Sequence, residues 1–266
     1  MNRFSIFAKI LVKSVFKPKL ARELIEERNQ INDEHNWRNH QYQYDFDSID
    51  DFFSKKFPDI NIKKYEKELV QLENSVEKFF KELEMEEYPS IEKPYPINYS
   101  INSDLRRFLY ILCRIMKPEN IIETGVAYGL SSMYILSALD KNESGILHSI
   151  DSIFRPWQTE KMIGSIIPES LKKRWKFTLG KSVDKLQETF DNAKNVDIFI
   201  HDSLHTYKNM IFEFECANKN LREKALIISD DVLDNDAFFN FTIKRKLENY
   251  LIKVDNDLGL GFIQKN

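Results

Sequence analysis

The stretch IIETGVAYGLS, residues 121–131, decides the fold. An apolar run leads into Gly125 and Gly129, and the chain then continues directly into a predicted helix. Gly125 allows a sharp turn and Gly129 the close approach of a ligand, while the N-terminus of the helix favours an anionic group. The spacing is GxxxG, which differs from the GxGxxG of a dinucleotide fold. The stretch predicts a strand, a glycine turn and a helix.

Four further short apolar runs follow, at 146–151, 175–180, 196–202 and 225–231. Each has the length, the β-branched residues and the flanking turns of a buried strand. Strands that alternate with helices form right-handed βαβ units, so the sheet is predicted to be parallel and covered on both faces. After a helix at 237–247, the link DNDLG between two last apolar runs permits an antiparallel hairpin. These features predict a doubly wound α/β fold.

The N-terminal part of the chain has a different character. All 7 glycines lie at or after Gly125, so the preceding residues are predicted to be helix and proline-containing connector. Apolar residues repeat every three or four positions over 62–83, which indicates a long helix with one apolar seam. That seam is equally consistent with a partner helix in a homodimer and with the core of the same chain. Three prolines lie between 89 and 96, and Ser103 is the predicted N-cap of a helix over 104–116.

We therefore divide the chain into a helical N-terminal extension, 1–100, and a Rossmann-like domain, 101–266. Residues 1–22 are basic, with apolar residues at helical spacing. Such a helix can lie on an anionic membrane, or it can pack on its own protein or on a sister subunit, which we favour. Lys9 and Lys13 interrupt the apolar stretch, so we do not expect a signal peptide.

Composition excludes several classes of protein. The chain has 266 residues, of which 42% are hydrophobic and 30% charged, and its net charge is −3. These values fit neither a disordered tail nor a membrane bundle, and they give no reason to expect a nucleic-acid partner. Cys113 and Cys216 are the 2 cysteines, which excludes a disulfide framework and a cysteine-rich zinc module. We expect a cytoplasmic protein.

Polar residues at the carboxyl ends of the predicted strands are candidates for a site, because ligands bind there in such sheets. Asp151 ends the second strand, where it can accept hydrogen bonds from both hydroxyls of a ribose or cap the next helix. Ser182 follows the third strand, and its hydroxyl can reach an adenine edge.

The fourth predicted strand ends at Asp202, and the fifth ends at Asp230 and Asp231. Three converging carboxylates repel one another unless a cation or a proton lies among them, and oxygen ligands suit Mg²⁺. Helix capping by Asp202 and Asp231 is the alternative. His205 is a candidate general base because an imidazole with a pKa near about 6.5 is mostly neutral at pH 7, although it too could cap a helix. His201 and His148 are predicted to be structural.

The motifs ETGVAYGLSS, HSID, LGKS, DIFIHDSLHTY and IISDDV together resemble those of class I S-adenosylmethionine-dependent methyltransferases. The resemblance is to the O-methyltransferase branch with the catechol and macrocin-type enzymes, of the family 24 type, and it covers roughly 104–266. It implies a seven-stranded, mostly parallel sheet whose last strand is antiparallel. The sequence departs from the family pattern at Ser203, where a glycine is common, and at 222–224, where a Pro-Gly-Gly turn is usual.

The resemblance also assigns site residues. The cofactor S-adenosylmethionine would be bound by Glu123, Gly125, Gly129, Ser131, Asp151, Ser182 and Asp202. The methionine end of the cofactor would be held by Glu123, Gly125 and Ser131. The ribose would be bound by Asp151, and the adenine would lie near Ser182. Mg²⁺ or another divalent cation would be bound by Asp202, Asp230 and Asp231, and catalysis would involve His205 and Asp202.

The function implied is metal-assisted O-methylation of a hydroxyl on a small molecule or sugar, such as a surface glycan. An NAD-dependent oxidoreductase on a similar sheet is one alternative, which the GxxxG spacing disfavours. A non-catalytic cofactor-binding assembly subunit is the other, and the three carboxylates argue against it. We expect a homodimer or higher homo-oligomer, no nucleic-acid partner, and residues 1–22 as a candidate contact with the inner membrane face.

Overall fold

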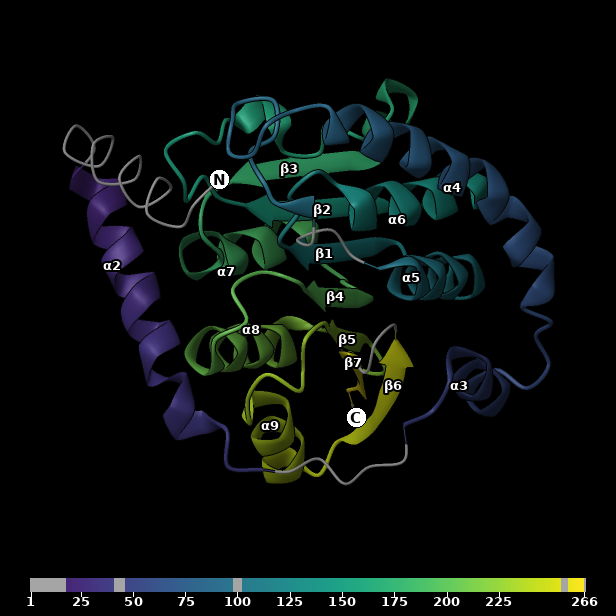
Figure 1. Cartoon of the computed structure of the whole chain (residues 1–266). Coiled ribbons are helices and arrows are strands. Elements are labelled where there is room, and N and C mark those ends of the chain that lie inside the picture. The colour runs from purple at the N-terminus through teal and green to yellow at the C-terminus, as the bar shows by residue number, and fades with distance from the viewer. Residues whose placement is uncertain (1–17, 41–45, 98–101, 255–257, 266) are drawn as a thin grey trace.

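The computed structural model describes residues 18–40, 46–97, 102–254 and 258–265. Its strands form one seven-stranded sheet in the order β3-β2-β1-β4-β5-β7-β6 (Figure 1). Six strands run in the same direction, and β7 lies antiparallel between β5 and β6. The strands are β1 (Asn120–Thr124), β2 (Ile146–Asp151), β3 (Trp175–Leu179), β4 (Ile198–His201), β5 (Leu226–Ser229), β6 (Glu248–Val254) and β7 (Leu258–Gln264). The predicted fold class is confirmed, including the terminal hairpin.

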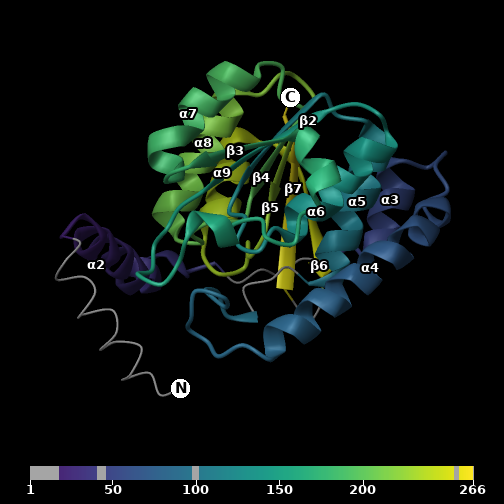
Figure 2. The ribbon, with the colours of Figure 1, turned by 90° about the horizontal axis from the view of Figure 1, so that it is seen from above.

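Helices cover both faces of the sheet (Figure 2). One face carries α7 (Ser182–Ala193), α8 (Tyr207–Asn220) and α9 (Ala237–Arg245). The other carries α5 (Ser103–Met116), α6 (Leu130–Lys141) and, against β6, α3 (Ile49–Lys56), with α4 (Lys63–Glu84) outside α5. Short 3-10 helices are η1 (Glu34–Trp37), η3 (Glu160–Met162) and η4 (Glu169–Arg174). Buried side chains on each face form a separate apolar core, as both faces of a parallel sheet require.

The seam of α4 packs on its own chain. Tyr65, Leu69 and Val76 are buried in the same core as the apolar side of α5. Ion pairs reinforce the contact, for example Arg114 with Glu68, whose nitrogen and oxygen atoms lie 3.1 Å apart. The sequence was consistent with a partner helix in a homodimer and with the core of the same chain. The described residues of the seam pack in the core of the same chain.

The start of α5 corrects the sequence prediction. Asn102, and not Ser103, is the N-cap: its side-chain oxygen accepts a hydrogen bond of 2.8 Å from the backbone N–H of Leu105. The helix therefore begins at Ser103, one residue earlier than expected. Asparagine and serine are both good N-caps, and Asn102 has the extended backbone, with φ −69° and ψ 169°, that the position requires.

The helix α2 (Pro18–Asp33) is the first described element, so only the end of the predicted basic helix, residues 18–22, is seen. Its first part, residues 1–17, lies outside the described residues. Within the described ranges, no helix is long and apolar enough to cross a membrane.

Candidate active site

Two glycines shape the turn that follows β1. Gly125 has φ 87° and Gly129 has φ 90°, values that L side chains rarely adopt. A Cβ on Gly125 would lie 1.8 Å from the carbonyl oxygen of Asp202, and one on Gly129 would lie 2.7 Å from the Cα of Gly164. The sharp turn predicted from the sequence is present, and Gly129 packs against the chain itself at this point.

Asp151 holds this turn from the end of β2. One carboxylate oxygen accepts hydrogen bonds from the N–H groups of Val126, at 3.0 Å, and Ala127, at 2.8 Å. The other accepts a hydrogen bond of 2.6 Å from the N–H of Ser152. Burial raises the pKa of Asp151, although these bonds favour its ionised form. From the described residues the second oxygen accepts this one bond, so it can still accept from a ligand hydroxyl.

Glu123 and Ser131 contact each other inside the protein. Glu123 is 1% exposed, and its carboxylate accepts hydrogen bonds from Ser131 at 3.2 Å, from Ser149 at 2.6 Å and from Ser132. Burial raises the pKa of Glu123 to about 7, although the serine hydroxyls act in the opposite direction. The pair therefore links β1 to the first turn of α6 beneath the glycine turn.

Ser182 is the first residue of α7, at the edge of the sheet where β3 ends. Its hydroxyl donates a hydrogen bond of 3.4 Å to the side-chain oxygen of Asn209 on α8. The predicted adenine-side residue thus lies at the same edge as the glycine turn, and its hydroxyl contacts α8.

The structure brings the predicted acidic residues together with His205. His205 Nδ1 lies 3.4 Å from an Asp231 carboxylate oxygen, and Nε2 lies 3.8 Å from one of Asp202. Burial and the neighbouring carboxylates raise the pKa of Asp202 well above its usual value. Burial is also the main cause of the raised pKa values of Asp230, about 7, and Asp231, about 6. The helix-capping alternative is wrong for these residues, because α8 begins after Thr206 and α9 after Asp236.

The His205 ring is neutral at physiological pH. Burial and the nearby His201 lower the pKa of His205 to about 3. His205 Nε2 and Asp230 Oδ1 are both buried and have no hydrogen-bond partner among the described residues. The unpartnered Nε2 is the free acceptor site of this imidazole, but a pKa of about 3 makes the ring a weaker base than the value of about 6.5 expected from the sequence.

The cluster does not have the arrangement of a metal site. Three carboxylates and the unpartnered oxygen of Asp230 have the chemistry that a hard cation prefers. However, the described part of the chain contains no group of three His, Cys, Asp or Glu side chains placed to hold a metal ion.

A buried glutamate beneath the cluster was missed in the sequence analysis. Glu213 of α8 has no exposed surface, and its carboxylate lies 2.6 Å from Nδ1 of His201. The sequence does contain a signal for it, since Met210, Phe214 and Ala217 form the apolar side of the helix and Glu213 falls on the same side. His201, predicted to be structural, is buried as its partner.

The helix α2 lies beside the edge at which the strands β1 and β2 end (Figure 1). Its Glu27 forms two hydrogen bonds, of 2.9 and 3.0 Å, with the guanidinium of Arg155 in the segment after β2. Gln30 accepts a hydrogen bond of 2.7 Å from the Thr206 hydroxyl, just before α8. Polar contacts thus hold this N-terminal helix across the loops that carry the candidate site.

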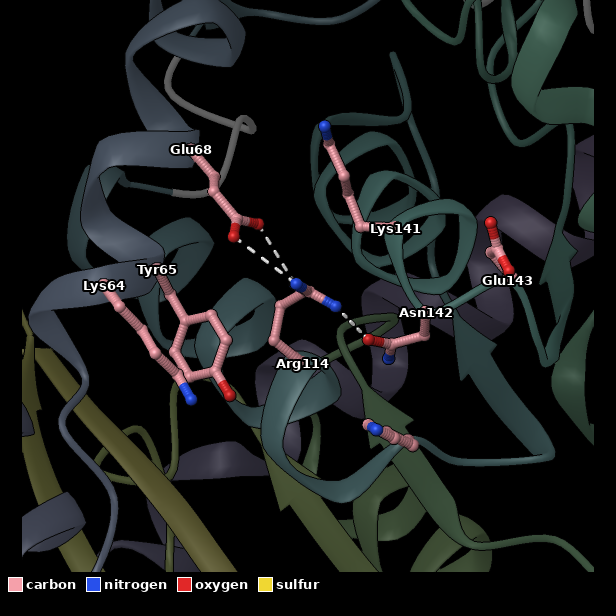
Figure 3. A pocket seen from close by; sticks show the side chains of 8 residues that line it. Lys64, Tyr65, Glu68, Arg114, Lys141, Asn142 and Glu143 are labelled. Carbon is pink, nitrogen blue, oxygen red and sulfur yellow. Dashed lines mark hydrogen bonds and ion pairs between the residues drawn. The ribbon is translucent and has the colours of Figure 1, made fainter.

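A pocket with a volume of about 440 Å³ lies elsewhere (Figure 3). Lys117 precedes β1 and Asn142 precedes β2, so the pocket opens at the opposite edge of the sheet from the acidic cluster. Arg114 crosses it and pairs with Glu68. Its lining residues are Lys64, Tyr65, Glu68, Arg114, Lys117, Lys141, Asn142 and Glu143.

Comparison with known proteins agrees with this geometry. Residues 122–232 match a family described as a methyltransferase domain. No match is found among curated protein sequences.

Solved methyltransferases share the fold. An O-methyltransferase from Bacillus cereus in complex with SAH has a TM-score of 0.56 at 16% identity, over 83% of this chain and 98% of that one. TomG from Streptomyces achromogenes, an O-methyltransferase of tomaymycin synthesis in complex with SAM, has a TM-score of 0.52 at 16% identity, over 85% and 100%. SAH-bound PaMTH1 from Podospora anserina has a TM-score of 0.52 at 14% identity, over 66% and 84%. Residues 122–232 therefore match a methyltransferase domain, and the chain has the fold of solved methyltransferases, as its motifs predict.

Proposed function

We propose that this protein transfers a methyl group from S-adenosylmethionine to a hydroxyl oxygen. The methyltransferase domain supports methyl transfer, and the SAM and SAH in the complexes of two similar O-methyltransferases support the cofactor and the acceptor atom. The observation that carries the proposal is the position of His205 between Asp202 and Asp231, on a turn that contacts the turn after β1.

The polar side chains at this edge of the sheet fit S-adenosylmethionine. Asp151 retains acceptor capacity for ribose hydroxyls while it holds the N–H groups of Val126 and Ala127. When bound, S-adenosylmethionine supplies an electrophilic methyl group on a positively charged sulfur. Glu123 and Ser131 support the glycine turn from below, and Ser182 would lie on the adenine side.

His205 supplies the acid–base chemistry. Nδ1 faces Asp231, so Nε2 is the atom that would take the proton of the acceptor hydroxyl. Bound S-adenosylmethionine would supply the methyl carbon to which the acceptor oxygen bonds, and its sulfur would keep the electron pair of the carbon–sulfur bond. The products are a methyl ether, S-adenosylhomocysteine and a proton, and Asp202 and Asp231 stabilise the imidazolium formed. Alignment of oxygen, carbon and sulfur supplies much of the rate.

A divalent ion remains a prediction. Asp202, Asp230 and Asp231 are the residues that would hold Mg²⁺, but in the described structure they do not form a three-ligand group, so we assign no step to a metal. Methyl transfer measured in Mg²⁺ and in EDTA tests this. Equal rates would support proton transfer by the side chains alone, and loss of turnover in EDTA would support the metal.

The acceptor that we propose is a small molecule or a sugar, such as a surface glycan. Two aromatic residues of α3, Phe52 and Phe53, are buried in the core and so give no support to a sugar site. Trp37 is 41% exposed, but its ring stacks on Tyr207 at 4.1 Å. Three further predictions remain. They are a homo-oligomer, no nucleic-acid partner, and a candidate membrane contact through residues 1–22.

The experiment for this proposal is methyl transfer from labelled S-adenosylmethionine to a panel of phenols, sugars and nucleotide sugars, with amines and thiols included as competing acceptors. Label recovered in an ether product would support O-methylation. Label recovered only on nitrogen or sulfur acceptors would contradict it.

A further inference from the structure

Glu213 is the centre of a hydrogen-bond network directly beneath the acidic cluster. Its side chain has no exposed surface, and among the described residues each carboxylate oxygen accepts two hydrogen bonds. Oε2 accepts from the Thr124 hydroxyl at 2.6 Å and from His201 Nδ1 at 2.6 Å. Oε1 accepts from the Ser203 hydroxyl at 2.8 Å and from the Asn209 side-chain amide at 3.1 Å. The donors come from the end of β1, the end of β4, the turn after β4 and α8.

These four bonds explain why a charge is tolerated in the core. A buried carboxylate is costly unless donors satisfy both of its oxygens. Although burial acts in the opposite direction, His201 and the hydroxyl donors lower the pKa of Glu213 to about 2, so the group is ionised. An ionised carboxylate only accepts hydrogen bonds, so His201 carries its proton on Nδ1.

That tautomer has a consequence for the active site. His201 Nε2 is buried and has no hydrogen-bond partner among the described residues. The ring of His201 meets the ring of His205 edge to face, with centroids 5.1 Å apart and planes at 87°. Glu213 therefore sets the orientation of the imidazole against which the candidate base packs.

The same carboxylate fixes the turn that carries Asp202 and His205. Ser203 and Asn209 both donate to it, and Asn209 also donates a hydrogen bond of 3.0 Å to the carbonyl oxygen of Leu204. The turn is thus tied to Glu213 through its first residues.

The cofactor side is tied to the same group. Thr124, which donates to Glu213, directly precedes Gly125, and the Cα of Gly125 packs against the carbonyl of Asp202. The turn after β1 and the turn after β4 therefore share one buried anchor.

We propose that Glu213 is a positioning residue for methyl transfer: it holds His201 and the turn 202–206 so that Asp202 and His205 face the cofactor turn. The inference rests on the proposed function. A leucine would match the apolar neighbours Met210, Phe214 and Ala217 on this side of α8, whereas the carboxylate supplies four acceptor interactions to residues at the active-site edge.

Glu213→Gln tests the proposal. The amide has nearly the same shape, but it replaces one accepting oxygen with a donor, so one of the two donor pairs loses its acceptor. We expect His201 to lose its single Nδ1–H tautomer, as read from imidazole nitrogen resonances. We also expect kcat on an acceptor hydroxyl to fall about tenfold or more, as removal of supporting partners commonly does, with S-adenosylhomocysteine affinity retained.

Glu215→Gln is the matched control, since Glu215 lies on the same helix with its side chain 44% exposed and paired with Arg245. Ser203→Ala is a milder variant that removes one donor and keeps the carboxylate, and we expect an intermediate fall in kcat. It keeps the proposal testable if Glu213→Gln does not fold.

The outcomes separate the two proposals. A wild-type His201 tautomer and wild-type kcat in Glu213→Gln, or a kcat reduced only in proportion to unfolded protein, would overturn the positioning role. The same result in Ser203→Ala would overturn it where Glu213→Gln does not fold. Failure of the wild-type chain to bind S-adenosylhomocysteine would instead overturn the proposed function, and the role of Glu213 in methyl transfer with it.

Discussion

Gly125 and Asp202 are in direct backbone contact. A Cβ on Gly125 would lie 1.8 Å from the carbonyl oxygen of Asp202, so no other residue fits there without movement of one of the two turns. Backbone hydrogen bonds hold both partners, from Gly125 to Ile150 and from Asp202 to Thr124, each 2.9 Å long. The turn after β1 and the turn that begins the acidic cluster are therefore built as one unit.

Gly125→Ala should disturb that unit. The φ of 87° and the contact with Asp202 both oppose a side chain, so we expect a loss of about 1–3 kcal/mol in the free energy of unfolding and weaker S-adenosylhomocysteine binding. Gly145→Ala is the matched control: it has φ 93° and a Cβ would lie 2.5 Å from the carbonyl oxygen of Pro118, at the opposite edge of the sheet. Gly145→Ala should lose stability but keep its affinity for S-adenosylhomocysteine. Equal affinities in the two variants would contradict the prediction.

His205→Gln should separate chemistry from cofactor binding. The variant lacks the nitrogen that takes the proton, so we expect kcat to fall by roughly 10² to 10⁴-fold while S-adenosylhomocysteine affinity is retained. The control is His148→Gln. His148 is 5% exposed, bonds to Asn120 and lies away from the acidic cluster. Wild-type kcat in His205→Gln would show that His205 is not the base.

Because the pKa of Glu123 is raised, we expect the free energy of unfolding to depend on pH. Burial raises its pKa in the folded protein from 4.5 to about 7, so the folded state resists ionisation of this group. Its contribution to stability is fully present below pH 4.5 and is lost as the pH rises through 7. At about 1.36 kcal/mol per pKa unit, the loss is on the order of 3 kcal/mol.

Urea unfolding of Glu123→Gln at pH 5 and pH 8 measures this contribution. The variant should lose less stability than the wild type between the two values, since glutamine does not ionise. Glu119→Gln, at an exposed position just before β1, should keep the wild-type difference. A difference in Glu123→Gln as large as that of the wild type would mean that another group is responsible.

The contact of α2 with the site edge should depend on ionic strength. Glu27 and Arg155 form a two-bond ion pair, with side chains 20% and 21% exposed, and salt weakens such pairs. We expect Glu27→Gln to release α2, seen as faster proteolysis of the helix at low salt. The wild type should approach the same rate in 0.5 M NaCl, on the order of the concentrations that screen exposed charges. The neighbouring exposed Glu26→Gln is the control, and equal protection of α2 in both variants would rule out the role of this pair.

Local sequence predicts much of the sheet. Each strand is a short apolar run between turns, and β2 occupies 146–151, as its composition predicts. The convergence of Asp202, Asp230 and Asp231 also follows from sequence, because the carboxyl ends of parallel strands meet at one edge. The site residues that could be placed this way are those next to a strand end.

The remaining features depend on contacts between distant residues. Glu213 and Thr124 are separated by 89 positions in the chain, and Glu27 and Arg155 by 128, so no local pattern pairs them. The prediction of Ser103 as the N-cap of α5 is wrong because the adjacent Asn102 suits the position equally well, and local sequence does not separate the two. The His205 contacts with Asp202 and Asp231 depend on the path of one turn, which composition does not fix.

Calorimetric titration with S-adenosylhomocysteine, with NAD as the control ligand, shows directly whether this protein binds the cofactor of a methyltransferase. We expect saturable binding of S-adenosylhomocysteine in Mg²⁺ and in EDTA alike, because Asp151 and the glycine turn would hold it without a metal ion, and we expect no binding of NAD. Binding of NAD alone, or of neither ligand, would contradict the methyltransferase function proposed for this site.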